Sequence, residues 1–142
     1  MITFYTKIYY ISLYLTNTNV IIIYRNRFHG LAPEPRPGLP SGHIPHSISI
    51  PFQTLIETST GTFKSPQELK SLFELKGLNL NQSIITSCGS GVTAAILFLG
   101  IERARMVSTD KSSSLDSYEL ALYDGSWADW GAKGEISEKG PR

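Results

Sequence analysis

The sequence predicts an α/β domain with a mostly parallel sheet and helices on both of its faces. Short β-rich runs alternate with helical patterns, an order typical of strands joined by crossover helices. The length of 142 residues suits one domain, and 41% hydrophobic with 18% charged residues is typical of a soluble globular protein. The net charge of +1 provides no basic footprint for nucleic acid or for an anionic membrane surface.

The first 24 residues are rich in Tyr, Ile, Thr and Asn, with one Lys and no acidic residue. Their apolar stretches fall short of the roughly 18 residues of a membrane helix. No convincing cleavage site of a secretory signal follows them, and they lack the arginines of a mitochondrial presequence. Residues 20–23 have the β-branched composition of a buried strand.

The segment 30–45 contains most of the chain's eight prolines and three of its glycines, which excludes a regular helix or a central strand. We expect a structured loop, and a simple linker is the alternative. Arg27, Arg36 and His43 lie in or beside this segment. Glu34 is the one acidic residue within it.

A short strand and a helix follow the proline-rich segment. Residues 47–50 alternate between polar and apolar side chains, as a short strand does. The helix is expected to begin at Ser65, because an N-cap serine, Pro66 at the first helical position and Glu68 form a capping box. Gly77 is the expected end of this helix.

The next unit is a strand, a tight turn and a second helix. Residues 83–87 predict a buried parallel strand, and the apolar run 94–99 predicts a helix packed on the sheet. The glycine-containing turn 88–93 lies between them. Residues 106–117 are polar and predict a loop, and 120–123 predict another strand, which ends at a turn.

Cys88 is the only cysteine, so an internal disulfide is excluded, and the three histidines are too dispersed for a zinc site. A free cysteine is most often a core residue, but this one follows a strand at the edge where α/β sheets bind ligands. A turn containing Gly89 and Gly91, with a helix N-terminus after it, favours a bound anion or the thiolate itself. Ser90 can donate its hydroxyl to the sulfur, and Thr93 can cap the helix or face the same pocket. We therefore predict a reactive thiol.

A phosphatase with a catalytic cysteine would need an arginine six positions after it, to close a cradle around a dianion. Position 94 is an alanine, which argues against that activity. A loop without the arginine suits a smaller or less charged group, such as a sulfane sulfur.

The sequence Cys88-Gly-Ser-Gly-Val-Thr93 resembles the active-site loop of the 3-mercaptopyruvate sulfurtransferases, within the rhodanese superfamily. Several flanking motifs agree with this resemblance: Arg27-Phe28, Pro33-Glu-Pro-Arg36, Ser41-Gly-His-Ile-Pro45, Ser65-Pro-Gln-Glu-Leu69 and Tyr123-Asp-Gly-Ser-Trp127. We expect residues 26–131 to form the catalytic rhodanese-like domain, which is the C-terminal one in full-length members. Residues 1–25 are then an atypical segment outside the family match, and 132–142 are a C-terminal tail.

The resemblance implies a sulfurtransferase. The Cys88 thiolate takes sulfur from 3-mercaptopyruvate, or from thiosulfate, as a persulfide and passes it to a thiol, to thioredoxin or to a sulfur-relay protein. Ser90 matches a serine that assists proton movement, and Arg27 and Arg36 match arginines that hold the substrate's carboxylate and keto group. The other loop residues complete the expected substrate-binding set: Gly89, Gly91, Val92 and Thr93.

The resemblance implies no metal and no organic cofactor, and it implies a cytoplasmic or mitochondrial location. His43 matches a histidine that we expect to hold the loop by hydrogen bonds, whereas His46 stands where a glycine is usual. Trp127 and Trp130 are expected to pack in the core or at a domain interface.

An alternative function remains open. Family members place a non-catalytic rhodanese domain before the catalytic one, and this chain is too short to contain both. The alternative is therefore a non-enzymatic or inactive rhodanese-like fragment, or a binding module, that lacks the partner domain.

Overall fold

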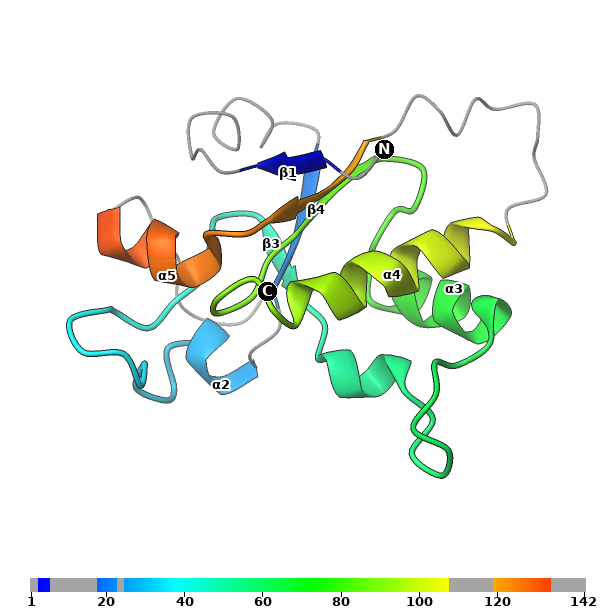
Figure 1. Cartoon of the computed structure of the whole chain (residues 1–142), viewed down its shortest axis with the longest axis horizontal. Coiled ribbons are helices and arrows are strands. Elements are labelled where there is room, and N and C mark those ends of the chain that lie inside the picture. The colour runs from blue at the N-terminus through cyan, green and yellow to red at the C-terminus, as the bar shows by residue number, and fades with distance from the viewer. Residues whose placement is uncertain (1–2, 6–17, 23–24, 108–118, 134–142) are drawn as a thin grey trace.

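The computed structural model describes residues 3–5, 18–22, 25–107 and 119–133, which form a five-stranded sheet with helices around it (Figure 1). All of the strand pairings are parallel, and the strand order is β1-β5-β4-β2-β3. The strands are β1 (Thr3–Tyr5), β2 (Thr18–Ile22), β3 (Ser47–Ser49), β4 (Ser83–Thr86) and β5 (Leu120–Tyr123). The strands expected at 47–50, 83–87 and 120–123 are confirmed, and the run 20–23 overlaps β2.

The helices lie between successive strands, except for the last two, which follow β5. They are α2 (Arg25–Phe28), the 3₁₀ helix η1 (Phe52–Leu55), α3 (Pro66–Leu75), α4 (Ala94–Arg105), α5 (Ser126–Trp130) and the 3₁₀ helix η3 (Gly131–Lys133). Figure 1 shows α3 and α4 side by side, away from α2 and α5. None of the described helices is both long and apolar enough to cross a membrane.

The alternation of side chains along the strands divides the core between the two faces of the sheet. In β4, Ile84 belongs to a large cluster and its neighbour Ile85 to a smaller one. The large cluster contains buried side chains of α3 and α4, such as Phe73 and Leu97. The smaller cluster contains Phe28 of α2 and both tryptophans of α5. Helices therefore cover both faces of a parallel sheet, and the predicted fold class is confirmed.

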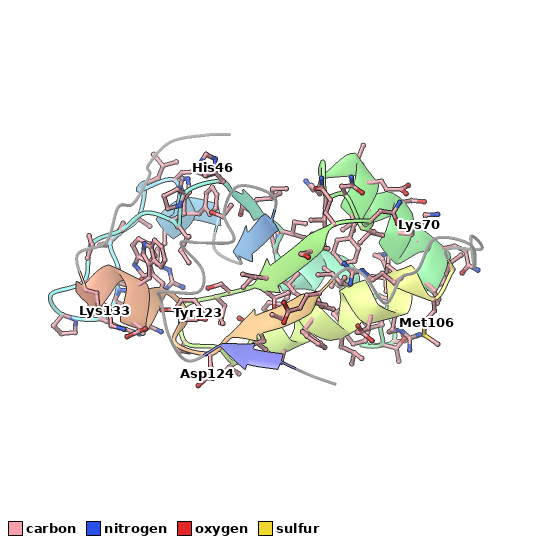
Figure 2. All side chains as sticks on the ribbon, turned by 90° about the horizontal axis from the view of Figure 1, so that it is seen from above. His46, Lys70, Met106, Tyr123, Asp124 and Lys133 are labelled. Atoms are coloured by element: carbon pink, nitrogen blue, oxygen red, sulfur yellow. The ribbon has the colours of Figure 1, made fainter. Side chains whose placement is uncertain are left out.

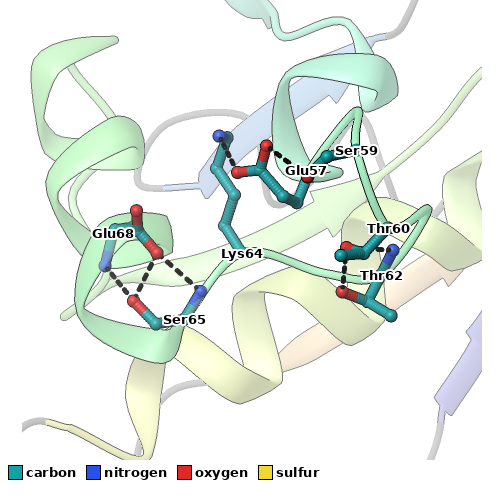
Figure 3. A network of polar contacts seen from close by, with 7 residues as sticks. All are labelled: Glu57, Ser59, Thr60, Thr62, Lys64, Ser65 and Glu68. Atoms are coloured by element: carbon teal, nitrogen blue, oxygen red, sulfur yellow. Dashed lines mark hydrogen bonds and ion pairs between the residues drawn. The ribbon is translucent and has the colours of Figure 1, made fainter.

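The predicted ends of α3 are also confirmed. The Ser65 hydroxyl accepts a hydrogen bond from the Glu68 N–H at 3.3 Å, and the Glu68 carboxylate accepts one from the Ser65 N–H at 2.9 Å (Figure 3). The Ser65 hydroxyl also donates to the Glu68 carboxylate at 2.6 Å, and this bond, followed by the one from the Ser65 N–H, lowers the pKa of Glu68. At the other end Gly77 has a φ of 79°, and the Leu78 N–H donates to the Phe73 carbonyl at 3.0 Å. This left-handed residue and its bonds end the helix.

Two features differ from the sequence-based expectations, and a third expectation is not tested. Helix α4 continues past the expected run 94–99 to Arg105, whose guanidinium donates to the carbonyls of Leu80 at 3.1 Å and Gln82 at 2.7 Å. The short helices α2 and α5 were not expected. The expected loop 106–117 lies mostly outside the described residues.

The N-terminal segment also contributes to the sheet. Strand β2 belongs to the segment 1–25 that was set apart from the family match, yet it pairs with β3 on one side and with β4 on the other. Strand β1 pairs with β5 at the sheet edge. The structure therefore builds part of its sheet from residues that carry no family motif.

Candidate active site

The candidate site lies at the edge of the sheet where β2 and β4 end. These strands are parallel neighbours, so their carboxyl ends meet at one edge. Cys88 follows β4, which ends at Thr86, and α2 with Arg27 follows β2, which ends at Ile22. Figure 1 shows α2, α5 and the loop before α4 at this end of the sheet. The topology thus brings together residues about sixty positions apart in the chain.

Helix α5 binds the cysteine loop, residues 88–93, because N–H groups of the helix donate to carbonyl groups of the loop. The Cys88 carbonyl accepts a hydrogen bond from the Trp127 N–H at 3.0 Å, and the Gly89 carbonyl accepts one from the Ala128 N–H at 3.0 Å. Trp127 is 5% exposed, and its indole donates to the Pro40 carbonyl at 2.8 Å. The predicted core packing of Trp127 is confirmed, and the residue also connects the proline-rich loop to the cysteine loop.

At Gly91 both the backbone conformation and the nearby atoms exclude a residue with a side chain. Its φ is 85°, and a Cβ atom at this position would lie 2.7 Å from the Asp124 carbonyl oxygen. Asp124 belongs to the turn after β5 that is seen at the end of this strand in Figure 2. The loop can therefore curl tightly around the sulfur only because this residue is a glycine.

Cys88 is 1% exposed, and its environment favours the thiolate. Burial raises the pKa of this thiol, but four hydrogen-bond donors together outweigh burial and hold the pKa below its ordinary value. These donors are the Thr93 hydroxyl, the backbone N–H groups of Ser90 and Ala94, and the Ser126 hydroxyl. Since the thiolate is the nucleophilic form of cysteine, the loop is arranged for attack by sulfur.

The structure decides between the two expectations for Thr93. This residue is the N-cap of α4, but its side chain makes no capping hydrogen bond. Its hydroxyl is buried and has no well-formed hydrogen bond among the described residues, although it is the strongest contributor to the lowered pKa of Cys88. Thr93 therefore faces the sulfur and does not cap the helix.

Sequence reasoning missed Ser126. Its hydroxyl accepts a hydrogen bond from the Cys88 N–H at 3.0 Å, donates to the Tyr123 carbonyl at 2.9 Å and lies 3.9 Å from the Cys88 sulfur. The hydroxyl has one proton, so it can donate to the carbonyl or to the sulfur but not fully to both. The φ of Ser126 is 49°, an unusual conformation for a serine. The motif 123–127 was noticed, but no local pattern indicates that its serine reaches a cysteine 38 residues earlier.

The other predicted loop residues have different surroundings. Ser90 is exposed, and its contribution to the lowered pKa of Cys88 comes from its backbone N–H. Val92 is 75% exposed at the outside of the loop, and Gly89 is buried against α5. The proton-transfer role of the Ser90 hydroxyl and the substrate contact of Val92 stay predictions.

The two predicted arginines meet at a single carboxylate. Arg27 Nη1 lies 3.5 Å from Glu34 Oε2, and Arg36 forms a short ion pair with the other oxygen of the same carboxylate. The Glu34 side chain is 2% exposed, whereas those of Arg27 and Arg36 are 23% and 35% exposed. The carboxylate thus lies beneath two guanidinium groups that reach the surface.

His43 has the structural surroundings that its motif predicts. Its ring stacks on Phe28 at a centroid distance of 3.8 Å, and its Nδ1 lies 2.7 Å from the Phe28 carbonyl oxygen. These contacts join the proline-rich loop to α2. His46, which is labelled in Figure 2, has a φ of 63°, a left-handed conformation that a glycine adopts more readily than a histidine.

No group of three or more possible metal-binding side chains occurs within the described ranges. The described site contains one buried sulfur, a set of hydrogen-bond donors around it and an arginine pair after the neighbouring strand. This arrangement can perform nucleophilic chemistry on an anionic donor.

Comparisons with known proteins agree with this chemistry. Thiosulfate/3-mercaptopyruvate sulfurtransferase 2 of Arabidopsis thaliana is 45% identical over 104 residues, which are 73% of this chain and 27% of that protein. The 3-mercaptopyruvate sulfurtransferase of Escherichia coli K12 is 38% identical over 110 residues, which are 78% of this chain and 34% of that protein. The chain therefore spans about a third of the length of these curated relatives.

A solved structure and a family profile also show similarity to sulfurtransferases and to the rhodanese-like domain. This chain aligns with the solved structure of the sub-stoichiometric sulfur transferase subunit of yeast mitochondrial complex I. The TM-score is 0.70 and the identity is 38%, over 92% of this chain and 40% of that subunit. The profile of the rhodanese-like domain matches residues 34–133, which include Arg36, the cysteine loop and α5 and begin after Arg27. The chain belongs to the rhodanese-like domain family.

Proposed function

We propose that this chain is a sulfurtransferase domain that moves sulfane sulfur from 3-mercaptopyruvate, or from thiosulfate, through a persulfide on Cys88. The observation that carries the proposal is the buried cysteine after β4, whose pKa is lowered by hydrogen bonds despite its burial. The identity to curated sulfurtransferases supports the same activity.

In the first half-reaction the Cys88 thiolate attacks the sulfur of 3-mercaptopyruvate. A sulfur–sulfur bond forms and the carbon–sulfur bond breaks, so the carbon fragment leaves as the enolate of pyruvate and takes up a proton. Thiosulfate would instead release sulfite. The N–H groups of Ser90 and Ala94 and the Thr93 hydroxyl can hold the negative charge before the attack and on the persulfide after it.

In the second half-reaction an acceptor thiolate attacks the outer sulfur of the persulfide. The acceptor leaves with this sulfur, and Cys88 returns to the thiolate that its surroundings favour. A small thiol, thioredoxin or a sulfur-relay protein can act as the acceptor. The chemistry requires no metal and no organic cofactor, because both steps exchange bonds between sulfur atoms and their neighbours.

The arginine pair is suited to bind the donor. Guanidinium groups match carboxylate oxygens in geometry and charge, and Arg27 and Arg36 both reach the surface after the strand next to β4. Ser90 is exposed beside the sulfur, where its hydroxyl can exchange a proton with the leaving group. We assign a cytoplasmic or mitochondrial location, since a reducing compartment keeps a lone thiol free.

The decisive experiment is intact-protein mass spectrometry after brief exposure to 3-mercaptopyruvate or to thiosulfate, with pyruvate or sulfite assayed in parallel. We expect the chain to gain one sulfur atom, and Cys88→Ser to gain none. The alternative is a rhodanese-like binding module that needs a further domain for activity, since the chain spans about a third of its relatives. A folded chain that gains no sulfur from either donor would favour that alternative.

A further inference from the structure

The arginine pair has a partner whose role is not yet assigned. Glu34 offers one carboxylate oxygen to Arg27 and the other to Arg36, and its side chain is 2% exposed. A buried carboxylate is stable only when it is paired, and here both of its oxygens face a guanidinium group. The three side chains therefore form one ionic unit, with the negative group inside and the positive groups outside.

The backbone around Glu34 restricts this unit to few conformations. Glu34 lies between two prolines, which fix their own φ angles and keep the residue before each of them extended. The Ser41 hydroxyl donates to the Ala32 carbonyl at 2.6 Å, which closes the loop. The Arg27 carbonyl accepts the N–H of Gly42 at 3.0 Å, which ties α2 to the same loop. The carboxylate is thus presented from a constrained scaffold rather than from a mobile chain.

The charge of the unit follows from its members. Two guanidinium groups and one carboxylate leave one net positive charge. A donor with a single carboxylate, such as 3-mercaptopyruvate, matches that charge. Thiosulfate carries two negative charges, and without the glutamate the same two arginines would suit such a dianion better.

We propose that Glu34 is a positioning and specificity-determining residue. It joins Arg27 and Arg36 into one anion-binding unit of single positive charge and so favours a singly charged sulfur donor over a doubly charged one. This inference rests on the proposed function, in which the two arginines bind the donor.

The test compares Glu34→Gln and Glu34→Asp with the parent chain, using single-turnover persulfide formation on Cys88 with 3-mercaptopyruvate and with thiosulfate. Glu34→Gln raises the net charge of the site from one positive charge to two. Thiosulfate, which has one more negative charge than 3-mercaptopyruvate, gains more attraction from this change, so the ratio of its efficiency to that of 3-mercaptopyruvate should rise about tenfold. Glu57→Gln is the matched control, since Glu57 pairs with Lys64 in a half-exposed contact, and its ratio should not change.

Glu34→Asp separates position from charge. It keeps the negative charge but is one methylene too short to reach both guanidinium groups in the same geometry. We expect the half-saturating concentrations of both donors to rise several-fold, with the maximal rate of persulfide formation and the donor ratio retained. Parent-like half-saturation in a folded Glu34→Asp would overturn the positioning role, and this variant remains informative if Glu34→Gln does not fold. An unchanged donor ratio in folded Glu34→Gln would overturn the specificity role.

A binding measurement separates this inference from the proposed function. If the parent chain forms no persulfide from either donor, the sulfurtransferase proposal fails, but anion binding can still be read from protection of Cys88 against iodoacetamide. Pyruvate serves as the singly charged probe and sulfate as the doubly charged one. Glu34→Gln should strengthen protection by sulfate relative to pyruvate by about tenfold. Equal relative protection in the parent chain and in Glu34→Gln would overturn the inference.

Discussion

Replacing Thr93 with valine tests how the loop activates its cysteine. Valine has nearly the same shape as threonine but lacks the hydroxyl, which is the strongest of the groups that lower the pKa of Cys88. The hydroxyl has no other well-formed hydrogen bond among the described residues. The substitution therefore removes one donor to the sulfur and orphans no other group.

The magnitude follows from the value of a hydrogen bond to a charged group. Such a bond contributes about 1.5 kcal/mol, which corresponds to about a tenfold change in an equilibrium. Without it, the pKa of Cys88 rises toward its ordinary value. At a pH below the pKa, the thiolate fraction and the rate of alkylation by iodoacetamide should fall about tenfold in Thr93→Val. At a pH well above the pKa both proteins are ionised, and their rates should converge.

The same substitution should leave the fold intact. Below its pKa Cys88 is mostly the neutral thiol, which gains little from the hydroxyl, so we expect the free energy of unfolding of Thr93→Val to stay within about 1 kcal/mol of the parent value. The assay is the alkylation rate as a function of pH, followed by intact-protein mass spectrometry, with urea unfolding in parallel. An unchanged pH profile in a stable Thr93→Val would refute the reasoning and assign the thiolate's stabilisation to the backbone N–H groups.

Three further substitutions test the supports of the site. Gly91→Ala should lower the free energy of unfolding in urea by about 2 kcal/mol or more, because a left-handed alanine is strained and its Cβ meets a backbone carbonyl; a parent-like urea midpoint would contradict this. Ser126→Ala should slow alkylation of Cys88 below its pKa, but less than Thr93→Val does, since Ser126 is the weakest of the four donors; the reverse order would contradict the assignment. Arg105→Ala should cost about 2 kcal/mol in urea unfolding, because it leaves two loop carbonyls without their charged donor; near-parent stability would show that water replaces the guanidinium.

The sequence predicted those parts of the fold whose causes are local. The capping box at Ser65 and the glycine at position 77 determine both ends of α3 through contacts within a few residues. The β-rich run before Cys88 and the glycines after it likewise predict a strand and a tight turn. Helix α4 was expected only over the apolar run 94–99. Its second half carries charged residues, which fit a helix with one solvated face as well as they fit a loop.

The sequence could not predict the parts of the site that depend on distant contacts. Helix α5 has five residues, and its first N–H groups bond to the carbonyls of Cys88 and Gly89. So short an element has no periodicity to recognise. The role of Ser126 depends on the same long-range docking. Glu34 was visible as the only acid beside the arginines, but its position beneath both of them follows from the path of the proline-rich loop.

The central place of β2 determines where this domain can be cut. The family profile begins at residue 34, so a designer guided by it alone would start an expression clone there. Such a clone would lack β1 and also β2, which connects β3 to β4, so β3 would be separated from the β4–β5 pair. Exposed strand edges of this kind promote aggregation. The smallest folding unit must therefore begin before Thr18, although the recognisable chemistry of the chain begins later.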